Sequence, residues 1–79
     1  MDARKKAIKA HIEACVRGRT EIGLNDLRRR LAWKLPTDPW AQDGRFVAKM
    51  LNELGWRRDG WLGTGYDREA RYVPIWARG

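Results

Sequence analysis

Four polar side chains between residues 42 and 52 have the types and the spacing needed to read the edge of a base pair. They are Gln42, Arg45, Lys49 and Asn52. Successive members are three or four residues apart, so on a helix they share one side. Arginine pairs with guanine through two hydrogen bonds, and asparagine or glutamine pairs with adenine in the same way. We therefore predict that these residues contact DNA. The alternative is a solvated helix face, because residues 39–55 carry no net charge.

Four arginines follow in a segment that is rich in glycine. They are Arg57, Arg58, Arg68 and Arg71. Arginines on a β-hairpin can contact phosphates or the minor groove, so we predict that these four also bind nucleic acid. Trp61 and Tyr66 lie near the tip of the same hairpin. Their rings either stack on bases or pack on a neighbouring helix, and packing is the more common role of such aromatic residues.

The charge of the chain favours a polyanionic partner. Its 79 residues include 17 Lys and Arg against 10 Asp and Glu, a formal charge of +7, which favours phosphate contacts and counterion release. This length fits a single domain, residues 1–79. No apolar run is long enough to cross a bilayer or to form a signal sequence, so we expect a cytoplasmic protein with no membrane contact.

Residue types that perform catalysis or hold metals are scarce. Cys15 is the only cysteine and His11 the only histidine, which excludes an intrachain disulfide and a zinc site with several cysteines. The sequence has no Ser-His-Asp set and no phosphate-binding loop. Asp67 and Glu69 stand among arginines, where salt pairing explains them better than acid-base catalysis. We therefore expect neither enzyme activity nor a cofactor.

The first half of the chain predicts two helices. Residues 1–16 form the first, with Asp2 as its N-cap and Gly18 beyond its end. Residues 19–24 are either a short strand or an extended connector. A second helix follows over residues 26–33. The two buried sides are expected to be Ile8, Ile12, Cys15 and Val16 in the first helix, and Leu24, Leu27 and Leu31 around the second.

Asn25 is the predicted N-cap of the second helix. The arginine triplet 28–30 within that helix cannot point in one direction, so phosphate contact and simple exposure remain equal alternatives for it. Pro36 and Pro39 then force a turn.

A third helix follows the turn and ends before Gly55. Asp38-Pro39 is the favoured start, because an N-cap residue followed by proline is a typical first turn, and Asp43 is the rival start. The apolar stripe of this helix is Phe46, Val47, Met50, Leu51 and Leu54.

Two hairpins are compatible with the residues after Gly55. Asp59-Gly60 is a tight-turn signal for a short hairpin followed by a loop. The interpretation that we prefer is one long hairpin with its tip in residues 63–68, where glycine and charge exclude a core position. The four other tryptophans are expected in the core or at its edge. They are Trp33, Trp40, Trp56 and Trp76.

This order of elements predicts an α+β fold, a winged helix made of a three-helix bundle, a short strand and a C-terminal β-hairpin. Residues 46–58, which include Leu54-Gly55-Trp56, and the later Arg71-Tyr72-Val73 resemble the end of the winged-helix module at the C-termini of phage-type, virulence-associated E primase-helicases. The resemblance covers residues 20–73, although this chain has no helicase and its hairpin loop is long. It implies a DNA-binding module of phage or mobile-element type.

Three functions remain open on these grounds. The first is binding of duplex DNA, with the third helix in the major groove and the hairpin on the backbone. The second is a protein-interaction module or inhibitor that docks on a nucleic-acid enzyme, which the neutral third helix and the many tryptophans favour. The third is binding of single-stranded nucleic acid through Trp61 and Tyr66.

Overall fold

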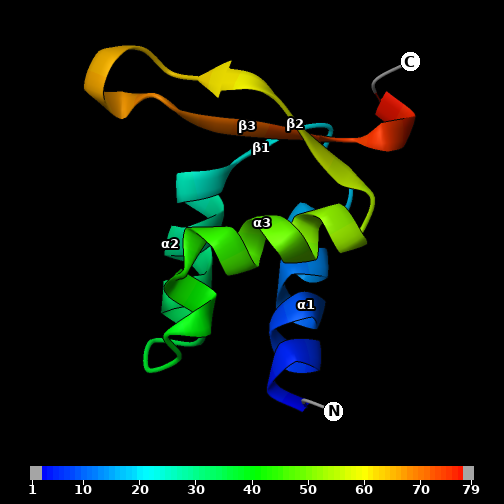
Figure 1. Cartoon of the computed structure of the whole chain (residues 1–79), viewed down its shortest axis with the longest axis vertical. Coiled ribbons are helices and arrows are strands. Elements are labelled where there is room, and N and C mark those ends of the chain that lie inside the picture. Colours follow the sequence, from blue (N-terminus) through cyan, green and yellow to red (C-terminus); the bar gives the residue numbers. More distant parts are fainter. Residues whose placement is uncertain (1–2, 78–79) are drawn as a thin grey trace.

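The structure, a computed structural model, describes residues 3–77 as three α-helices and a three-stranded antiparallel sheet (Figure 1). The elements in chain order are α1 (Ala3–Val16), β1 (Ile22–Gly23), α2 (Leu24–Lys34), η1 (Trp40–Gln42), α3 (Gly44–Glu53), β2 (Trp56–Leu62), η2 (Gly65–Asp67), β3 (Glu69–Pro74) and η3 (Ile75–Ala77), where η marks a short 3-10 helix. The predicted α+β class is confirmed. The predicted N-cap Asp2 lies outside the described residues.

β3 is the central strand of the sheet, with β1 on one side and β2 on the other. Between Arg58 and Trp61 the pairing slips by one residue, and Gly60 there takes a φ of 78°. This is a β-bulge, in which one extra residue bends the strand without ending it. Asp59 and Gly60 therefore lie inside β2, and the long hairpin with its tip in residues 63–68 is confirmed.

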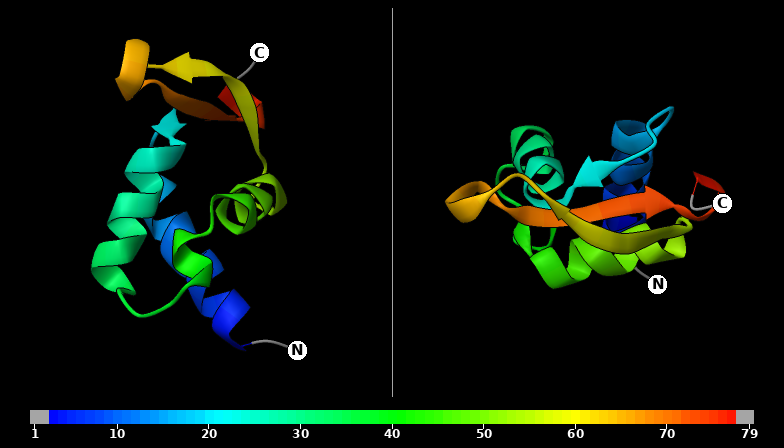
Figure 2. Two further views of the ribbon diagram at one scale, coloured as in Figure 1. Left: turned by 60° about the vertical axis from the view of Figure 1, so that its left-hand side comes forward. Right: turned by 90° about the horizontal axis from the view of Figure 1, so that it is seen from above.

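The core lies between the helices and the inner face of the sheet (Figures 1 and 2). α1 and α2 stand below the sheet in Figure 1, and α3 crosses in front of them. Phe46 and Leu54 of the predicted stripe are only partly buried, as is Cys15. The largest fully buried side chains come from all three helices, β1 and β3: Ile8, Ile12, Ile22, Leu27, Leu31, Val47, Met50, Leu51 and Pro74.

The beginning of α2 differs from the sequence prediction. The helix starts at Leu24, and its N-cap is Gly23 rather than Asn25. Oε1 of Glu69 on β3 accepts a hydrogen bond from the backbone N–H of Asp26 at 2.9 Å. That donor is the one that an N-cap side chain normally satisfies. A Cβ on Gly23 would overlap the Glu69 carboxylate. Glu69 thus caps the helix instead of forming the predicted salt pair.

The beginning of α3 is at the rival position, and the favoured start near Pro39 is wrong. Asp43 is the N-cap, and its side chain accepts hydrogen bonds from two first-turn amides. The residues before it form η1 only. The Gln42 carbonyl accepts two hydrogen bonds from the Arg28 side chain, at 2.6 and 2.9 Å. Because the Gln42 carbonyl is occupied and the Asp43 backbone is extended, η1 does not continue into α3.

Two of the four tryptophans expected near the core are exposed. Trp56 is buried and Trp40 is partly buried against the core, as predicted. Trp33 is 88% exposed and Trp76 is 73% exposed. Trp33 lies two positions after Leu31, about 200° further round the helix, so it points away from the buried side. Trp76 lies in η3, after the chain has left β3.

Candidate nucleic-acid interface

The outer face of α3 carries Arg45, Lys49 and Asn52, and all three side chains are exposed. The opposite face is the buried one that faces α1, α2 and the sheet. Within residues 3–77 the Arg45 side chain forms no hydrogen bond or ion pair. The structure therefore brings three of the four predicted helix residues together on one accessible surface.

The acidic residues at the two ends of α3 are both engaged elsewhere. Asp43 caps the helix. Glu53 turns towards α1, where its carboxylate lies 3.6 Å from Nζ of Lys5 and 3.2 Å from Nζ of Lys9. The hydrogen bond from Lys9 holds the pKa of Glu53 below its ordinary value, although desolvation opposes this shift, and the charges of Lys5, Lys9 and Lys49 add to the lowering. The segment is neutral in sequence, but its outer face is positive.

Arg57 connects the end of α3 to the start of the hairpin. Its Nη1 donates hydrogen bonds of 2.8 Å to the backbone carbonyls of Asn52 and Trp56. Gly55, with a φ of 90°, ends α3 between these two residues, as predicted. β2 is the edge strand of the sheet and lies on the same side of the molecule as α3 (Figure 2, right). The base of the hairpin therefore continues the basic face of α3.

Arg58 and Arg68 are held on the hairpin by Trp61. Each guanidinium carbon lies 4.3 Å from the centre of a Trp61 ring, which is a cation–π distance. Sequence reasoning missed this cluster, because a spacing of three residues in a regular strand puts Arg58 and Trp61 on opposite faces. The bulge at Gly60 returns both side chains to one face, as their pairing with alternate residues of β3 requires.

The Arg71 side chain is engaged in ion pairs within the protein. Its Nε lies 2.7 Å from a carboxylate oxygen of Glu21, and its Nη1 lies 3.1 Å from that of Asp59. Nη1 also donates to the Asp59 carbonyl at 3.2 Å. The hydrogen bond with Glu21 raises the pKa of Arg71 above its ordinary value. Arg71 thus links β3 to β2 and to the residue just before β1, and it is not presented for a phosphate contact.

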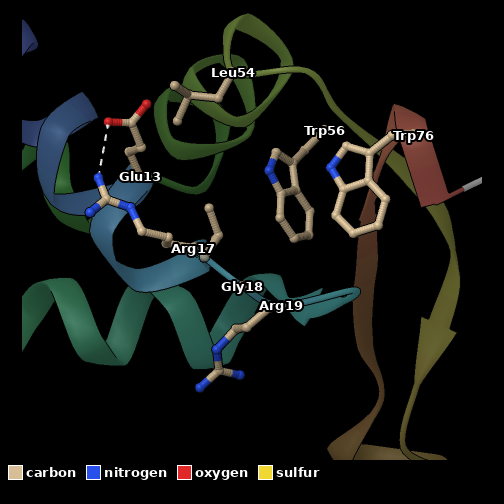
Figure 3. A pocket seen from close by; sticks show the side chains of 8 residues that line it. Glu13, Arg17, Gly18, Arg19, Leu54, Trp56 and Trp76 are labelled. Carbon is tan, nitrogen blue, oxygen red and sulfur yellow. Dashed lines mark ion pairs between the residues drawn. The ribbon is translucent and has the colours of Figure 1, made fainter.

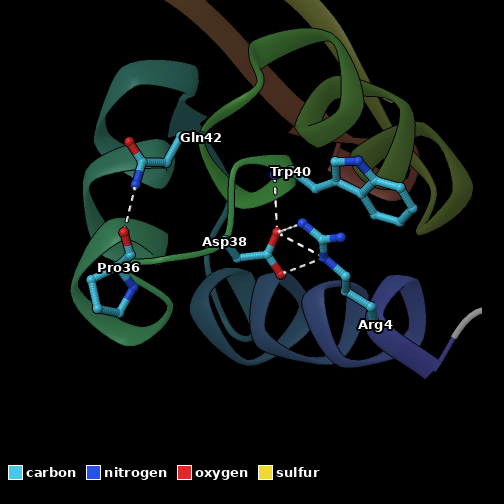
Figure 4. Close-up of polar contacts among 5 residues, drawn as sticks. All are labelled: Arg4, Pro36, Asp38, Trp40 and Gln42. Atoms are coloured by element: carbon cyan, nitrogen blue, oxygen red, sulfur yellow. Dashed lines mark hydrogen bonds and ion pairs between the residues drawn. The ribbon is translucent and has the colours of Figure 1, made fainter.

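Gln42 does not lie on α3 (Figure 4). It belongs to η1, and its Nε2 donates to the Pro36 carbonyl at 3.3 Å. The adjacent turn is fixed by Asp38, which pairs with Arg4 at 2.7 Å and accepts a hydrogen bond from the Trp40 backbone. The prediction that Gln42 shares a helix with Arg45 is therefore wrong, because the helix begins two residues after Gln42.

Only one member of the arginine triplet on α2 lacks a partner within residues 3–77. Arg28 donates to the Gln42 carbonyl, and Arg30 pairs with Asp26 at 3.1 Å. Arg29 is exposed, and its side chain forms no hydrogen bond or ion pair in that range. The triplet is thus mainly structural.

The aromatic residues near the hairpin tip do not pack on a helix. Tyr66 is fully exposed in η2, and Trp61 is 50% exposed. Packing on a neighbouring helix, the more common role of such rings, is therefore wrong for Tyr66, and half of the Trp61 side chain remains exposed. The hairpin tip extends beyond the helices, so no helix surface is available there (Figure 1).

A second surface lies at the opposite end of the hairpin (Figure 3). It is an open cleft of about 320 Å³, lined by the buried Trp56 and the exposed Trp76. Arg17, which forms an ion pair of 3.8 Å with Glu13, and Arg19 line its other side. This cleft combines aromatic and cationic side chains away from the outer face of α3.

Comparisons of the chain with protein-family models, with curated proteins and with solved structures found no match. Within residues 3–77, no group of three or more His, Cys, Asp or Glu side chains is placed to hold a metal ion. In the same range, none of the helices has the length and apolar character needed to span a bilayer.

Proposed function

We propose that this protein is a winged-helix module that binds duplex DNA, with α3 in the major groove and the β2–β3 hairpin on the adjacent backbone. The observation that carries this proposal is the outer face of α3, where Arg45, Lys49 and Asn52 are exposed while the flanking acids are engaged elsewhere. The sheet order β1-β3-β2 and the order of the helices support the proposal, because they are compatible with a winged-helix arrangement. A phage or mobile-element origin rests on the sequence resemblance alone.

The dimensions of α3 suit a groove. An α-helix with its side chains is about 10–12 Å across, and the major groove of B-DNA is about 12 Å wide. With its apolar face held by the core, α3 can present only the side that bears Arg45 and Asn52. These two side chains have the geometry to read guanine and adenine, respectively. Lys49, between them, is suited to a phosphate contact.

The hairpin supplies the remaining positive charge. Arg57 at its base and Arg58 and Arg68 further along it can contact the backbone beside the groove. Together with Lys49 they make four phosphate contacts. Each contact contributes about −0.9 to the slope of log K against log salt, so we expect a slope of roughly −3.6. Affinity then falls about 150-fold between 50 and 200 mM salt.

Fluorescence anisotropy with a labelled duplex across this salt range tests the proposal. Lys49→Ala is expected to make the slope shallower by about 0.9, and the double variant Arg57→Ala/Arg58→Ala by about 1.8. Lys34→Ala is the matched control, since it removes one exposed charge from the last turn of α2 and is expected to leave the slope unchanged. Equal effects of Lys49→Ala and Lys34→Ala would show diffuse charge attraction without a defined face.

The exposed tryptophans favour a second candidate function. Trp33 and Trp76 lie outside the basic face, and Trp76 borders the open cleft at the hairpin base. Exposed tryptophans are enriched at protein interfaces. The alternative is therefore a module that docks on a protein, such as a nucleic-acid enzyme. Absence of DNA binding at 50 mM salt, with the fold intact, would favour this alternative over duplex binding.

A further inference from the structure

We propose that the hairpin tip binds an unpaired nucleotide next to the duplex, so that the protein prefers a duplex with a single-stranded extension over a blunt duplex. This inference rests on the proposed function and defines its substrate class. It depends on Tyr66, on the cluster of Trp61 with Arg58 and Arg68, and on the reach of the hairpin.

Tyr66 is held outward by a structured tip. It is the middle residue of η2, which is closed by backbone hydrogen bonds from Asp67 to Thr64 at 3.1 Å and from Arg68 to Gly65 at 3.3 Å. Because the backbone on both sides of Tyr66 is fixed, its ring projects away from the protein. A fully exposed aromatic ring in an ordered turn is available for stacking on a flat partner.

The side chains below the tip supply positive charge. Arg58 and Arg68 both lie on Trp61, and neither forms an ion pair within residues 3–77. Asp59 is taken by Arg71, and Glu69 caps α2. Asp67 is then the one acid at the tip that is not engaged within the described residues, so the tip keeps a net positive charge.

The hairpin is long enough to reach beyond the footprint of α3. β2 starts next to the end of α3, runs back towards the beginning of that helix and rises away from it (Figure 1). Its seven residues cover at most about 23 Å at roughly 3.3 Å each, whereas α3 covers about 15 Å. In Figure 1 the tip lies beyond the beginning of α3 and above it. A nucleotide there lies outside the segment that α3 occupies.

The chemistry of the tip selects an unpaired base. In an intact duplex both faces of each internal base are already stacked, whereas an unpaired base beside the duplex has a face free for an exposed ring. Single-stranded nucleic acid is bound in this way, through aromatic platforms beside cations that hold the backbone. Tyr66 is the platform here, and Trp61 holds the two cations, Arg58 and Arg68, beside it.

The test compares three labelled DNAs with the full chain: a blunt duplex, the same duplex with a six-nucleotide thymidine extension, and the single strand. Stacking of one base corresponds to at least about a fivefold gain in affinity, so we expect the extended duplex to bind about fivefold or more tightly than the blunt one. Tyr66→Ala is expected to abolish this preference and to leave the blunt duplex within twofold. Tyr66→Phe, which keeps the ring, is expected to retain it.

Trp33→Ala is the matched control, because it removes another largely exposed aromatic ring, from α2. It is expected to leave the preference unchanged. Circular dichroism checks that each variant is folded. Because Tyr66 is fully exposed, its substitution is not expected to unfold the protein.

The possible results separate this inference from the proposed function. Equal binding of both duplexes, with a loss in Lys49→Ala, would overturn the inference and leave duplex binding intact. A preference for the extension that Tyr66→Ala does not change would also overturn it. Binding of the extended duplex and the single strand that depends on Tyr66 but not on Lys49 would support the tip site and contradict the role of α3. No binding to any of the three DNAs would overturn both and indicate a protein partner.

Discussion

Removing the Glu69 carboxylate is expected to destabilise α2, although the two lie far apart in sequence. Gly23, the N-cap of α2, has no side chain, and Glu69 Oε1 accepts the hydrogen bond of the Asp26 amide at 2.9 Å. In the variant Glu69→Ala this amide loses its acceptor. The positive end of the helix also loses a nearby negative charge. Since Glu69 begins β3, the same change loosens the hairpin from the helices.

The size of the effect follows from these two losses. An N-cap acceptor contributes about 1 kcal/mol, and a carboxylate at the helix N-terminus about 0.5 kcal/mol more. The free energy of unfolding should therefore fall by about 1.5 kcal/mol. For a domain of this length each kcal/mol lowers the melting temperature by about 4–8 °C, so we expect a loss of about 6–12 °C. Glu69→Gln keeps the acceptor but removes the charge, so its free energy of unfolding is expected to fall by about a third as much as that of Glu69→Ala.

Thermal unfolding followed by circular dichroism measures these changes. Asp67→Ala removes the same charge from an exposed position of the same hairpin, and it should change stability by less than about 0.5 kcal/mol. Gly23→Ser adds a sharper test. In the native background its side chain displaces Glu69 and should destabilise. In the Glu69→Ala background the space is free, and the extended conformation of residue 23, φ −84° and ψ 140°, lets the serine hydroxyl cap Asp26. A substitution that has the same sign in both backgrounds would refute this explanation.

Two further predictions concern ion pairs. Arg71→Gln removes the contacts with Glu21 and Asp59, so it should lower the melting temperature but leave the salt slope of DNA binding unchanged. A slope that becomes shallower by about 0.9 would show that Arg71 does contact phosphate. The pKa of Glu53 is lowered by Lys9, so its stabilisation is present above its unfolded pKa and is lost as pH falls through its lowered folded pKa. Glu53→Gln should therefore be less stable than the native protein at neutral pH, and this difference should shrink as the pH is lowered through the acidic range in thermal unfolding. A constant difference across this range would contradict the role of the ion pair.

The sequence by itself predicted the order of the main helices and strands and most of the core, but not where α2 and α3 begin. The apolar spacing of Val47, Met50 and Leu51 predicts the buried side of α3, and the structure buries all three completely. Glycine at position 55 predicts the end of that helix. The glycines and charges of residues 63–68 place the hairpin tip correctly. These features are local, because helical periodicity and turn geometry depend on residues within a few positions of one another.

The sequence predicted part of the candidate site. Three predicted residues of α3 do share an exposed face, since helical spacing alone fixes which side they occupy. Sequence could not show that Glu53 is drawn to Lys5 and Lys9 of α1, which changes a neutral segment into a positive face.

Tertiary structure decided the remaining assignments, because each depends on a partner that is remote in sequence. In the sequence nothing distinguishes Arg71 from Arg58, and only the folded structure brings Glu21 into an ion pair with Arg71. Asn25 has the chemistry of an N-cap, but Glu69 arrives from β3 and occupies the space that Gly23 leaves open. Local propensities offer such alternatives at similar free energy. Contacts between distant segments select one of them, and in this chain they settle which arginines are left for a partner.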